Sequence, residues 1–194
     1  MLVGMKTIES IHLLEDESTM SAMVRGSVFV LAGGAALGAL WVIAAAAGLP
    51  LPMPELFGMS MALMAVWFFS AFVAHVLTLP VHELVHAACF KLLGPRGTRV
   101  RLGAKLDEGV LFAQATGAVL TRRRYMVVLL APCVVLSAAH AIAGAVLGWP
   151  FWALAQIVLH VAGCTGDLLM AREIAANRDV RWCRDTAYGA DLLA

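Results

Sequence analysis

Four long apolar stretches constrain the fold of this chain more than any other feature of its sequence. They run from Val28 to Leu49, from Met59 past Pro80 to Leu93, from Tyr125 to Leu147, and from Pro150 to about Met170. A helix of about 20 apolar residues crosses the ~30 Å hydrocarbon layer of a bilayer. Each stretch reaches that length. The sequence therefore predicts an all-α integral membrane protein with about four transmembrane helices.

The composition argues against an ordinary soluble domain. Hydrophobic residues make up 61% of the chain, charged residues only 14%, and the mean hydropathy is +0.85, whereas soluble domains carry about 25% charged residues. The first stretch, Val28 to Leu49, is longer than the apolar core of a secretory signal peptide and follows 27 mixed residues. We therefore expect it to be retained as the first span.

Basic residues fall on one side of the predicted spans. They occur in residues 1–27, in residues 172–194 and, with eight Lys and Arg, in the loop 91–124, whereas the two turns on the other side hold none. Because basic loops remain in the cytoplasm, we expect both termini to be cytoplasmic. The chain then divides into an amino-terminal segment 1–27, a membrane-embedded domain 28–171 and a cytoplasmic tail 172–194.

A short cytoplasmic β-hairpin is predicted between the second and third spans. Residues 98–103 and 109–116 are rich in β-forming residues and flank the turn-like stretch 104–109. An exposed strand of this hairpin could bind a substrate peptide by backbone pairing. The other interpretation is a solvated basic hairpin attracted to anionic lipid headgroups.

The two end segments carry weaker patterns. Residues 8–14 place isoleucine and leucine among polar residues, which suggests an amphipathic helix at the membrane interface or a gate. The tail 172–194 holds Trp182 and four arginines, which is typical of a segment that rests on a membrane surface. Neither segment indicates a substrate.

The second apolar stretch contains the pattern His-Glu-Leu-Val-His, with His82, Glu83 and His86. Residues four apart on a helix lie one turn above each other, so the two imidazoles can converge on one Zn²⁺ ion. Glu83 is then the candidate general base for water. A random match in a chain of this composition has a chance on the order of half a percent. The alternative is a pair of histidines that make ordinary helix contacts.

Asp167 is the only other carboxylate inside the predicted spans. An ionised group in the bilayer costs at least ~2.5 kcal/mol, so such residues usually have a functional partner. From the outer ends of their spans, Asp167 lies roughly 26 Å and His82 at most roughly 35 Å along the helix, so both approach the cytoplasmic side. We therefore expect His82, His86 and Asp167 to bind Zn²⁺. Alternatively, Asp167 stands alone at the end of its helix, where it is neutralised by Arg172 or faces cytoplasmic water.

Other residues near the motif leave further alternatives open. Cys89 and Cys164 each lie three residues from a proposed ligand, so a thiolate could replace Asp167. His75 and His160 lie seven residues before His82 and Asp167, where they could line a water path, although hydrogen bonding between helices is the commoner role. The four cysteines show no metal-binding spacing and are expected to be reduced.

The chain resembles the zincin peptidases of the DUF3267 family, which are similar in plan to the site-2 protease (M50) intramembrane metalloproteases. The resemblance rests on His82–Ala87 (HELVHA), on Leu130-Ala131-Pro132 in the next span and on Gly166-Asp167, and it covers roughly residues 80–170. It implies a zinc-dependent peptidase with His82, His86 and Asp167 as ligands and Glu83 as catalytic residue. Site-2 proteases carry the third ligand in an Asp-Gly motif, whereas Gly166 here precedes Asp167.

These observations favour a membrane-embedded zinc metallopeptidase that cleaves a peptide bond in or near the bilayer by attack of water. The expected partners are a membrane protein or peptide substrate and the lipid bilayer, not nucleic acid. The alternative function is a metal-binding or partner-binding membrane protein without catalysis. From the resemblance and the compactness of the chain, we expect it in a bacterial inner membrane.

Overall fold

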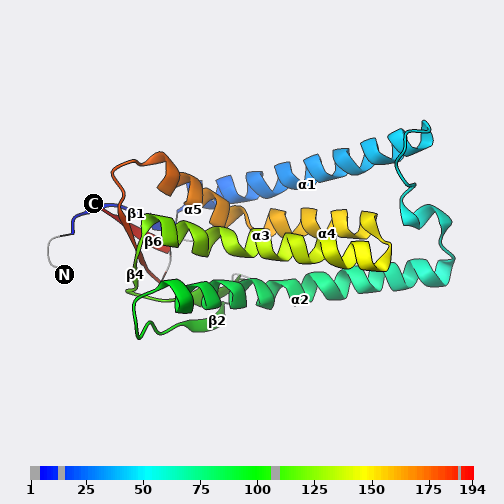
Figure 1. Ribbon diagram of the computed structural model, residues 1–194. Helices are drawn as coiled ribbons and strands as arrows, with labels where there is room; N and C mark the ends of the chain where they lie inside the picture. Colours follow the sequence, from blue (N-terminus) through cyan, green and yellow to red (C-terminus); the bar gives the residue numbers. More distant parts are fainter. Residues whose placement is uncertain (1–4, 13–15, 106–109, 188) are drawn as a thin grey trace. The chain divides into compact units, whose positions relative to one another are not determined.

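The chain folds into long apolar helices and two small antiparallel sheets (Figure 1). The computed structural model describes residues 5–12, 16–105, 110–187 and 189–194. In chain order, the elements are β1 (Thr7–His12), α1 (Glu17–Ala46), the 3-10 helix η1 (Glu55–Gly58), α2 (Met61–Leu93), β2 (Arg101–Lys105), β3 (Val110–Gln114), β4 (Val119–Thr121), α3 (Arg122–Leu147), α4 (Pro150–Gly163), α5 (Thr165–Ala176), β5 (Trp182–Asp185) and β6 (Gly189–Leu193).

Three helices, α1, α2 and α3, are long and apolar enough to cross a membrane. In an apolar 18-residue window of each helix, only 6%, 11% and 22% of the residues are buried. Soluble proteins rarely expose contiguous apolar surface on this scale. These helices are therefore compatible with a membrane protein, as the sequence predicts.

The fourth apolar stretch is not the single helix that the sequence led us to expect. Helix α4 ends at Gly163, and α5 begins at Thr165. A fourth span is present only if this bent pair counts as one broken span. The break falls in the small-residue run Gly163-Cys164-Thr165-Gly166, where glycine adds backbone freedom.

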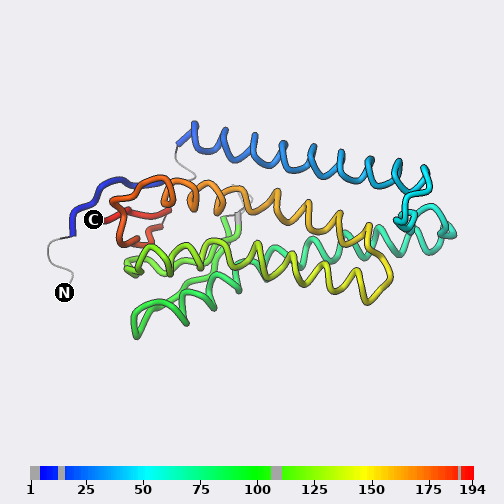
Figure 2. Tube along the Cα trace, turned by 45° about the horizontal axis from the view of Figure 1, so that its top comes forward, coloured from blue at the N-terminus to red at the C-terminus, as the bar shows by residue number. Residues whose placement is uncertain are grey.

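A four-stranded antiparallel sheet is the main departure from the predicted all-α fold. Its strand order is β1-β6-β5-β4, so it joins both ends of the chain to the residues just before α3. Figure 2 shows the red carboxyl-terminal strand beside the blue amino-terminal segment. The interfacial helix expected for residues 8–14 is wrong for residues 8–12, which belong to β1 (Thr7–His12). Residues 13 and 14 lie outside the described residues.

The carboxyl-terminal tail forms β5 and β6 of this sheet and is not a free segment. The physical reason is burial of one face of the strands. Cys183, Ala190 and Leu192 are all 0% exposed. Burial of apolar side chains stabilises this small sheet.

The predicted hairpin is confirmed. Strands β2 and β3 pair antiparallel, with Arg101 opposite Gln114 and Lys105 opposite Val110. Gly103 lies opposite Phe112, whose ring covers the position that a side chain at residue 103 would occupy. Most of the turn, residues 106–109, lies outside the described residues.

The chain divides into two compact units, and helices α2 and α3 contribute to both. Unit 1 consists of Met1–Val24, Leu79–Pro132 and Cys164–Ala194, and unit 2 consists of Arg25–Thr78 and Cys133–Gly163. Each unit has a hydrophobic cluster of its own.

Unit 1 has the larger core. Fully buried side chains of the four-stranded sheet, of α3 and of α5 meet there, including Leu120, Tyr125, Ile174 and Leu192. Because residues of the sheet and of α5 share one core, the tertiary packing of unit 1 fixes the place of α5 within it.

Unit 2 is held by a smaller cluster around Trp67, Trp152 and Ala153. Its single acidic residue is Glu55. The Glu55 carboxylate accepts hydrogen bonds from Trp67 Nε1 (3.0 Å) and from the backbone N–H groups of Phe151 (3.1 Å) and Trp152 (2.7 Å). Glu55 thus supplies acceptors for the otherwise unpaired N–H groups at the start of α4.

Candidate metal centre

The two motif histidines face each other on α2. His82 and His86 lie one helical turn apart, their ring centroids are 4.7 Å apart and their ring planes are inclined by 75°. The two Nε2 atoms are 3.0 Å apart. The predicted convergence of the imidazoles at this spacing is therefore present, with Nε2 as the converging atom of each ring.

Asp167 reaches both histidines from the first turn of α5. Its Oδ2 atom lies 3.1 Å from His82 Nε2 and 3.3 Å from His86 Nε2. Because α5 begins just after the break at Cys164, the carboxylate lies near a helix N-terminus, where the helix dipole stabilises negative charge. The structure thus brings together the three residues that the sequence singles out as candidate ligands.

The geometry of these three residues fits a zinc ion. Donor atoms on a tetrahedral Zn²⁺ at about 2.0–2.1 Å lie about 3.3 Å from one another. The observed separations of 3.0, 3.1 and 3.3 Å are close to that value. Two imidazoles and one carboxylate are also a donor set that catalytic zinc sites use.

A hydrogen bond fixes the orientation of the His86 ring. His86 Nδ1 lies 2.9 Å from the backbone carbonyl oxygen of Val128 on α3. In the tautomer in which Nδ1–H donates to this oxygen, the lone pair of Nε2 is left for a metal. Metal-ligating histidines usually have such a partner on the other nitrogen.

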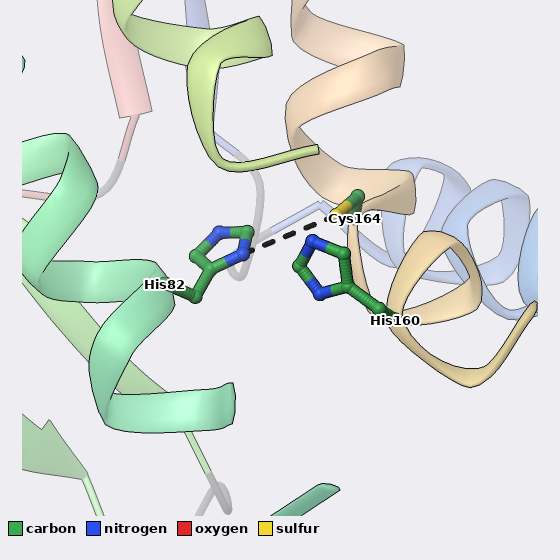
Figure 3. A group of neighbouring side chains, drawn as sticks. All are labelled: His82, His160 and Cys164. Carbon is green, nitrogen blue, oxygen red and sulfur yellow. Dashed lines mark hydrogen bonds between the residues drawn. The ribbon is translucent and has the colours of Figure 1, made fainter. Parts of the chain in front are cut away.

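Cys164 lies on the other side of the His82 ring. Its Sγ atom is 3.9 Å from His82 Nδ1, as the dashed line in Figure 3 shows. Asp167, by contrast, faces Nε2 of the same ring. Cys164 is therefore placed beside the nitrogen opposite the converging atoms, and Asp167 beside the converging atoms. Cys89, the other cysteine near the motif, packs against the core cluster of unit 1.

Glu83 lies close to all three candidate ligands. Its half-buried carboxylate interacts electrostatically with His82, His86 and Asp167, and also with the backbone N–H of Ala113 on β3. The hairpin thus contacts the candidate general base directly. Sequence analysis predicted the hairpin but not this contact, because no side chain at Ala113 signals it.

The three candidate ligands are mostly buried but not sealed. The side chains of His82, His86 and Asp167 are 15%, 9% and 19% exposed. A group in such a place is partly shielded from water, which strengthens its electrostatic interactions, yet a small molecule can still reach it.

Asp185, a buried carboxyl at the end of β5, has no counterpart among the candidate residues predicted from the sequence. Its Oδ2 atom accepts the Ala115 N–H (2.7 Å), and its Oδ1 atom accepts the Tyr125 hydroxyl (3.0 Å). Burial raises the pKa of Asp185 to about 6, although these two hydrogen bonds oppose the rise. The sequence carried no signal for it, since Asp185 lies outside every apolar stretch.

The remaining helix histidines, His75, His140 and His160, belong to unit 2. His140 Nε2 lies 3.1 Å from the Thr78 hydroxyl oxygen, which is the contact between helices expected for a buried histidine. The His140 and His160 rings are 6.2 Å apart. His75 Nδ1 is buried without a hydrogen-bond partner among the described residues.

The comparisons with known proteins point to one family. A sequence model of the family DUF3267, described as "Putative zincin peptidase", matches residues 75–179, which include the motif on α2 and Asp167. Neither the curated proteins nor the solved structures contain a match to the chain.

Proposed function

The chain belongs to the DUF3267 family of zincin peptidases, and we propose that it is a membrane-embedded zinc metallopeptidase that hydrolyses a peptide bond in or near the bilayer. The observation that carries the proposal is the convergence of His82, His86 and Asp167 beside Glu83. The family implies zinc, and the three donor atoms have the spacing of a tetrahedral zinc site.

In this proposal, Nε2 of His82, Nε2 of His86 and the Asp167 carboxylate hold the zinc ion. A zinc ion bound by these residues supplies two effects, a lower pKa for water and polarisation of the scissile carbonyl. The Val128 carbonyl keeps the His86 ring in its binding orientation.

Glu83 is the proposed general base and acid. Its carboxylate takes a proton from the attacking water as the water oxygen bonds to the carbonyl carbon. When the C–N bond breaks, Glu83 returns that proton to the leaving amine. The Ala113 N–H restricts the orientation of the carboxylate for both transfers.

The contact between Glu83 and β3 also supports a substrate class. A polypeptide that passes along β3 in extended form would lie next to Glu83, and backbone pairing suits any extended sequence. We therefore propose a membrane protein or membrane-adjacent peptide as substrate, unwound at the scissile bond.

We further propose that α1, α2, α3 and the bent pair α4–α5, as one broken span, cross a bacterial inner membrane, which places both termini in the cytoplasm. The apolar exposed surfaces of these helices and the basic loop 91–124 support this orientation. Since α2 leads from the motif into that loop, the site would lie near the cytoplasmic face.

Glu83→Gln in the detergent-purified full chain tests the proposal. Its amide cannot take a proton from water, so cleavage of fluorescently labelled unfolded casein should fall by about 10³-fold, within the range for loss of a general acid–base group. Zinc should remain near one equivalent by elemental analysis, because Glu83 is not a ligand. Glu173→Gln, which changes an exposed carboxylate on α5, is the matched control and should cleave casein like the wild type.

Two results would overturn the proposal. One is unchanged cleavage by Glu83→Gln. The other is wild-type protein with one zinc ion bound by four protein ligands, since such a closed site leaves no position for water.

A further inference from the structure

Two backbone N–H groups, one in β3 and one directly after it, point to the same side of the chain and face carboxyl groups. The Ala113 N–H interacts with the Glu83 carboxylate on α2, and the Ala115 N–H, two residues further, donates a hydrogen bond to the Asp185 carboxyl on β5. In extended chain, N–H groups two residues apart point to the same side. Strand β2 pairs with one edge of β3, so these two contacts hold the other edge, which β2 does not cover.

Asp185 holds the segment after β3 at several points. Besides the Ala115 N–H (2.7 Å), its backbone carbonyl accepts the Gly117 N–H (2.8 Å) and its backbone N–H donates to the Ala118 carbonyl (2.9 Å). Ala115 is 1% exposed and Asp185 is 6% exposed. This contact is therefore shielded from water, where a hydrogen bond to a carboxylate is strong.

The same carboxyl also reaches α3. The Tyr125 hydroxyl donates to Asp185 Oδ1 (3.0 Å), and Tyr125 is 2% exposed. Val128, whose carbonyl oxygen lies against His86, is three residues further along α3 and on the same face. Two backbone groups touch the proposed site, the Ala113 N–H and the Val128 carbonyl. Asp185 contacts a residue close to each of them, Ala115 near Ala113 and Tyr125 near Val128.

We infer that Asp185 is a positioning residue of the proposed peptidase: by holding Ala115 and Tyr125, it fixes β3 against Glu83 and α3 against His86. It touches neither the substrate nor the zinc ligands. The inference rests on the proposed function. Asp185 lies outside residues 75–179, which the family model matches, so the inference comes from the fold of this chain alone.

Substitutions at Asp185 separate positioning from general stability. Asp185→Ala removes both hydrogen bonds, whereas the Asp185→Asn amide can accept the Ala115 N–H and donate to the Tyr125 oxygen. Asp191→Ala is the matched control, because Asp191 lies in the same sheet and binds the Ser10 hydroxyl (2.8 Å) and Arg184 (3.5 Å). All variants are studied as full chains in detergent.

Casein cleavage gives the first measurement. We expect Asp185→Ala to lower kcat by about 100-fold, the scale of a small misplacement of catalytic groups, with KM and zinc content unchanged. Asp185→Asn should restore kcat to within a few-fold of wild type, and Asp191→Ala should leave it unchanged. The inference is overturned if Asp185→Ala keeps its kcat, or if both alanine variants lose kcat equally.

Hydrogen exchange gives a second measurement that does not need activity. In Asp185→Ala, the backbone of residues 110–118 should exchange about tenfold faster than in wild type, while Asp191→Ala should leave its exchange unchanged. Unchanged exchange in Asp185→Ala would overturn the inference. If wild-type protein cleaves nothing, the proposed function fails, and the exchange still decides whether Asp185 holds β3.

Discussion

The two units contain buried histidines in similar helices, but only unit 1 pairs them with a carboxylate. His82 and His86 both face Asp167 at 3.1 and 3.3 Å. In unit 2, His140 has the Thr78 hydroxyl and aromatic rings as neighbours. The only acid of unit 2, Glu55, is occupied by Trp67 and the start of α4. The Asp167 carboxylate therefore distinguishes the histidine pair of unit 1 from His140 in unit 2.

The units also differ in how they satisfy buried polar atoms. The Asp185 carboxyl and the Tyr125 hydroxyl in unit 1 bind each other. Four buried side-chain atoms without a hydrogen-bond partner among the described residues all belong to unit 2, namely His75 Nδ1, Ser137 Oγ, Trp152 Nε1 and Gln156 Oε1. Satisfied polar groups favour one defined arrangement. We thus expect unit 1 to be the more rigid unit, as a site with fixed geometry requires.

The largest expected effect is loss of zinc from Asp167→Ala. Removal of one of three protein ligands should reduce zinc from about one equivalent to near zero after dialysis, measured by elemental analysis. His140→Ala is the control for unit 2 and should keep its zinc. Zinc that remains bound in Asp167→Ala would contradict the role of Asp167 as the third ligand and point to Cys164 in its place.

Core truncation should separate the units next. Ile174 is 0% exposed in unit 1, so Ile174→Ala should lower the free energy of unfolding by about 2–5 kcal/mol. Phe29 in unit 2 is 79% exposed, so Phe29→Ala should change the free energy of unfolding in detergent by less than about 0.5 kcal/mol. Chemical denaturation followed by tryptophan fluorescence measures both. Equal losses would show that the exposed face of α1 is packed in the folded protein.

The pH dependence of stability should expose Asp185. Its pKa is about 6 when folded and about 3.8 as a free group, so the folded state favours the neutral carboxyl. Stability is then fully present below pH 4 and falls as the pH rises to 6, by up to about 3 kcal/mol. Asp185→Asn should remove this loss and raise stability at pH 7. A fall of equal size in Asp185→Asn would assign the pH dependence to other groups.

Glu55→Gln should give the smallest effect. An amide offers one acceptor oxygen where the carboxylate offers two, so one of the N–H groups at the start of α4 loses its acceptor and the others lose a charged partner. The free energy of unfolding should fall by about 1–2 kcal/mol, with zinc content and casein cleavage unchanged. Loss of zinc in Glu55→Gln would mean that the two units do not act separately.

The sequence predicts that the candidate ligands lie close together, and part of that prediction rests on local physical rules. The spacing of His82 and His86 places them one turn apart on any helix. Asp167 stood out because a carboxylate in an apolar stretch is costly. The hairpin was predictable from its β-forming residues, which flank a turn. The histidine spacing and the hairpin need only a few adjacent residues, whereas the meeting of Asp167 with His82 also needed the order of the spans.

The four-stranded sheet was not predictable in the same way. Strands β1, β5 and β6 are short, and β1 pairs with a strand almost the whole chain away. Only one residue of β1, Ile11, is buried, so its pattern shows no alternation. The hydrogen bonds of Asp185 with Ala115 and Tyr125 depend on where the sheet places the end of β5, and no local rule could find them.

Zinc X-ray absorption on the purified wild-type chain tests most directly whether His82, His86 and Asp167 bind zinc. If His82, His86 and Asp167 hold zinc with an open fourth position, the spectrum should show two imidazole nitrogens and two oxygens at about 2.0–2.1 Å, one of them exchangeable with azide. A sulfur scatterer at about 2.3 Å would contradict this ligand set, because a cysteine would then bind zinc where Asp167 is proposed.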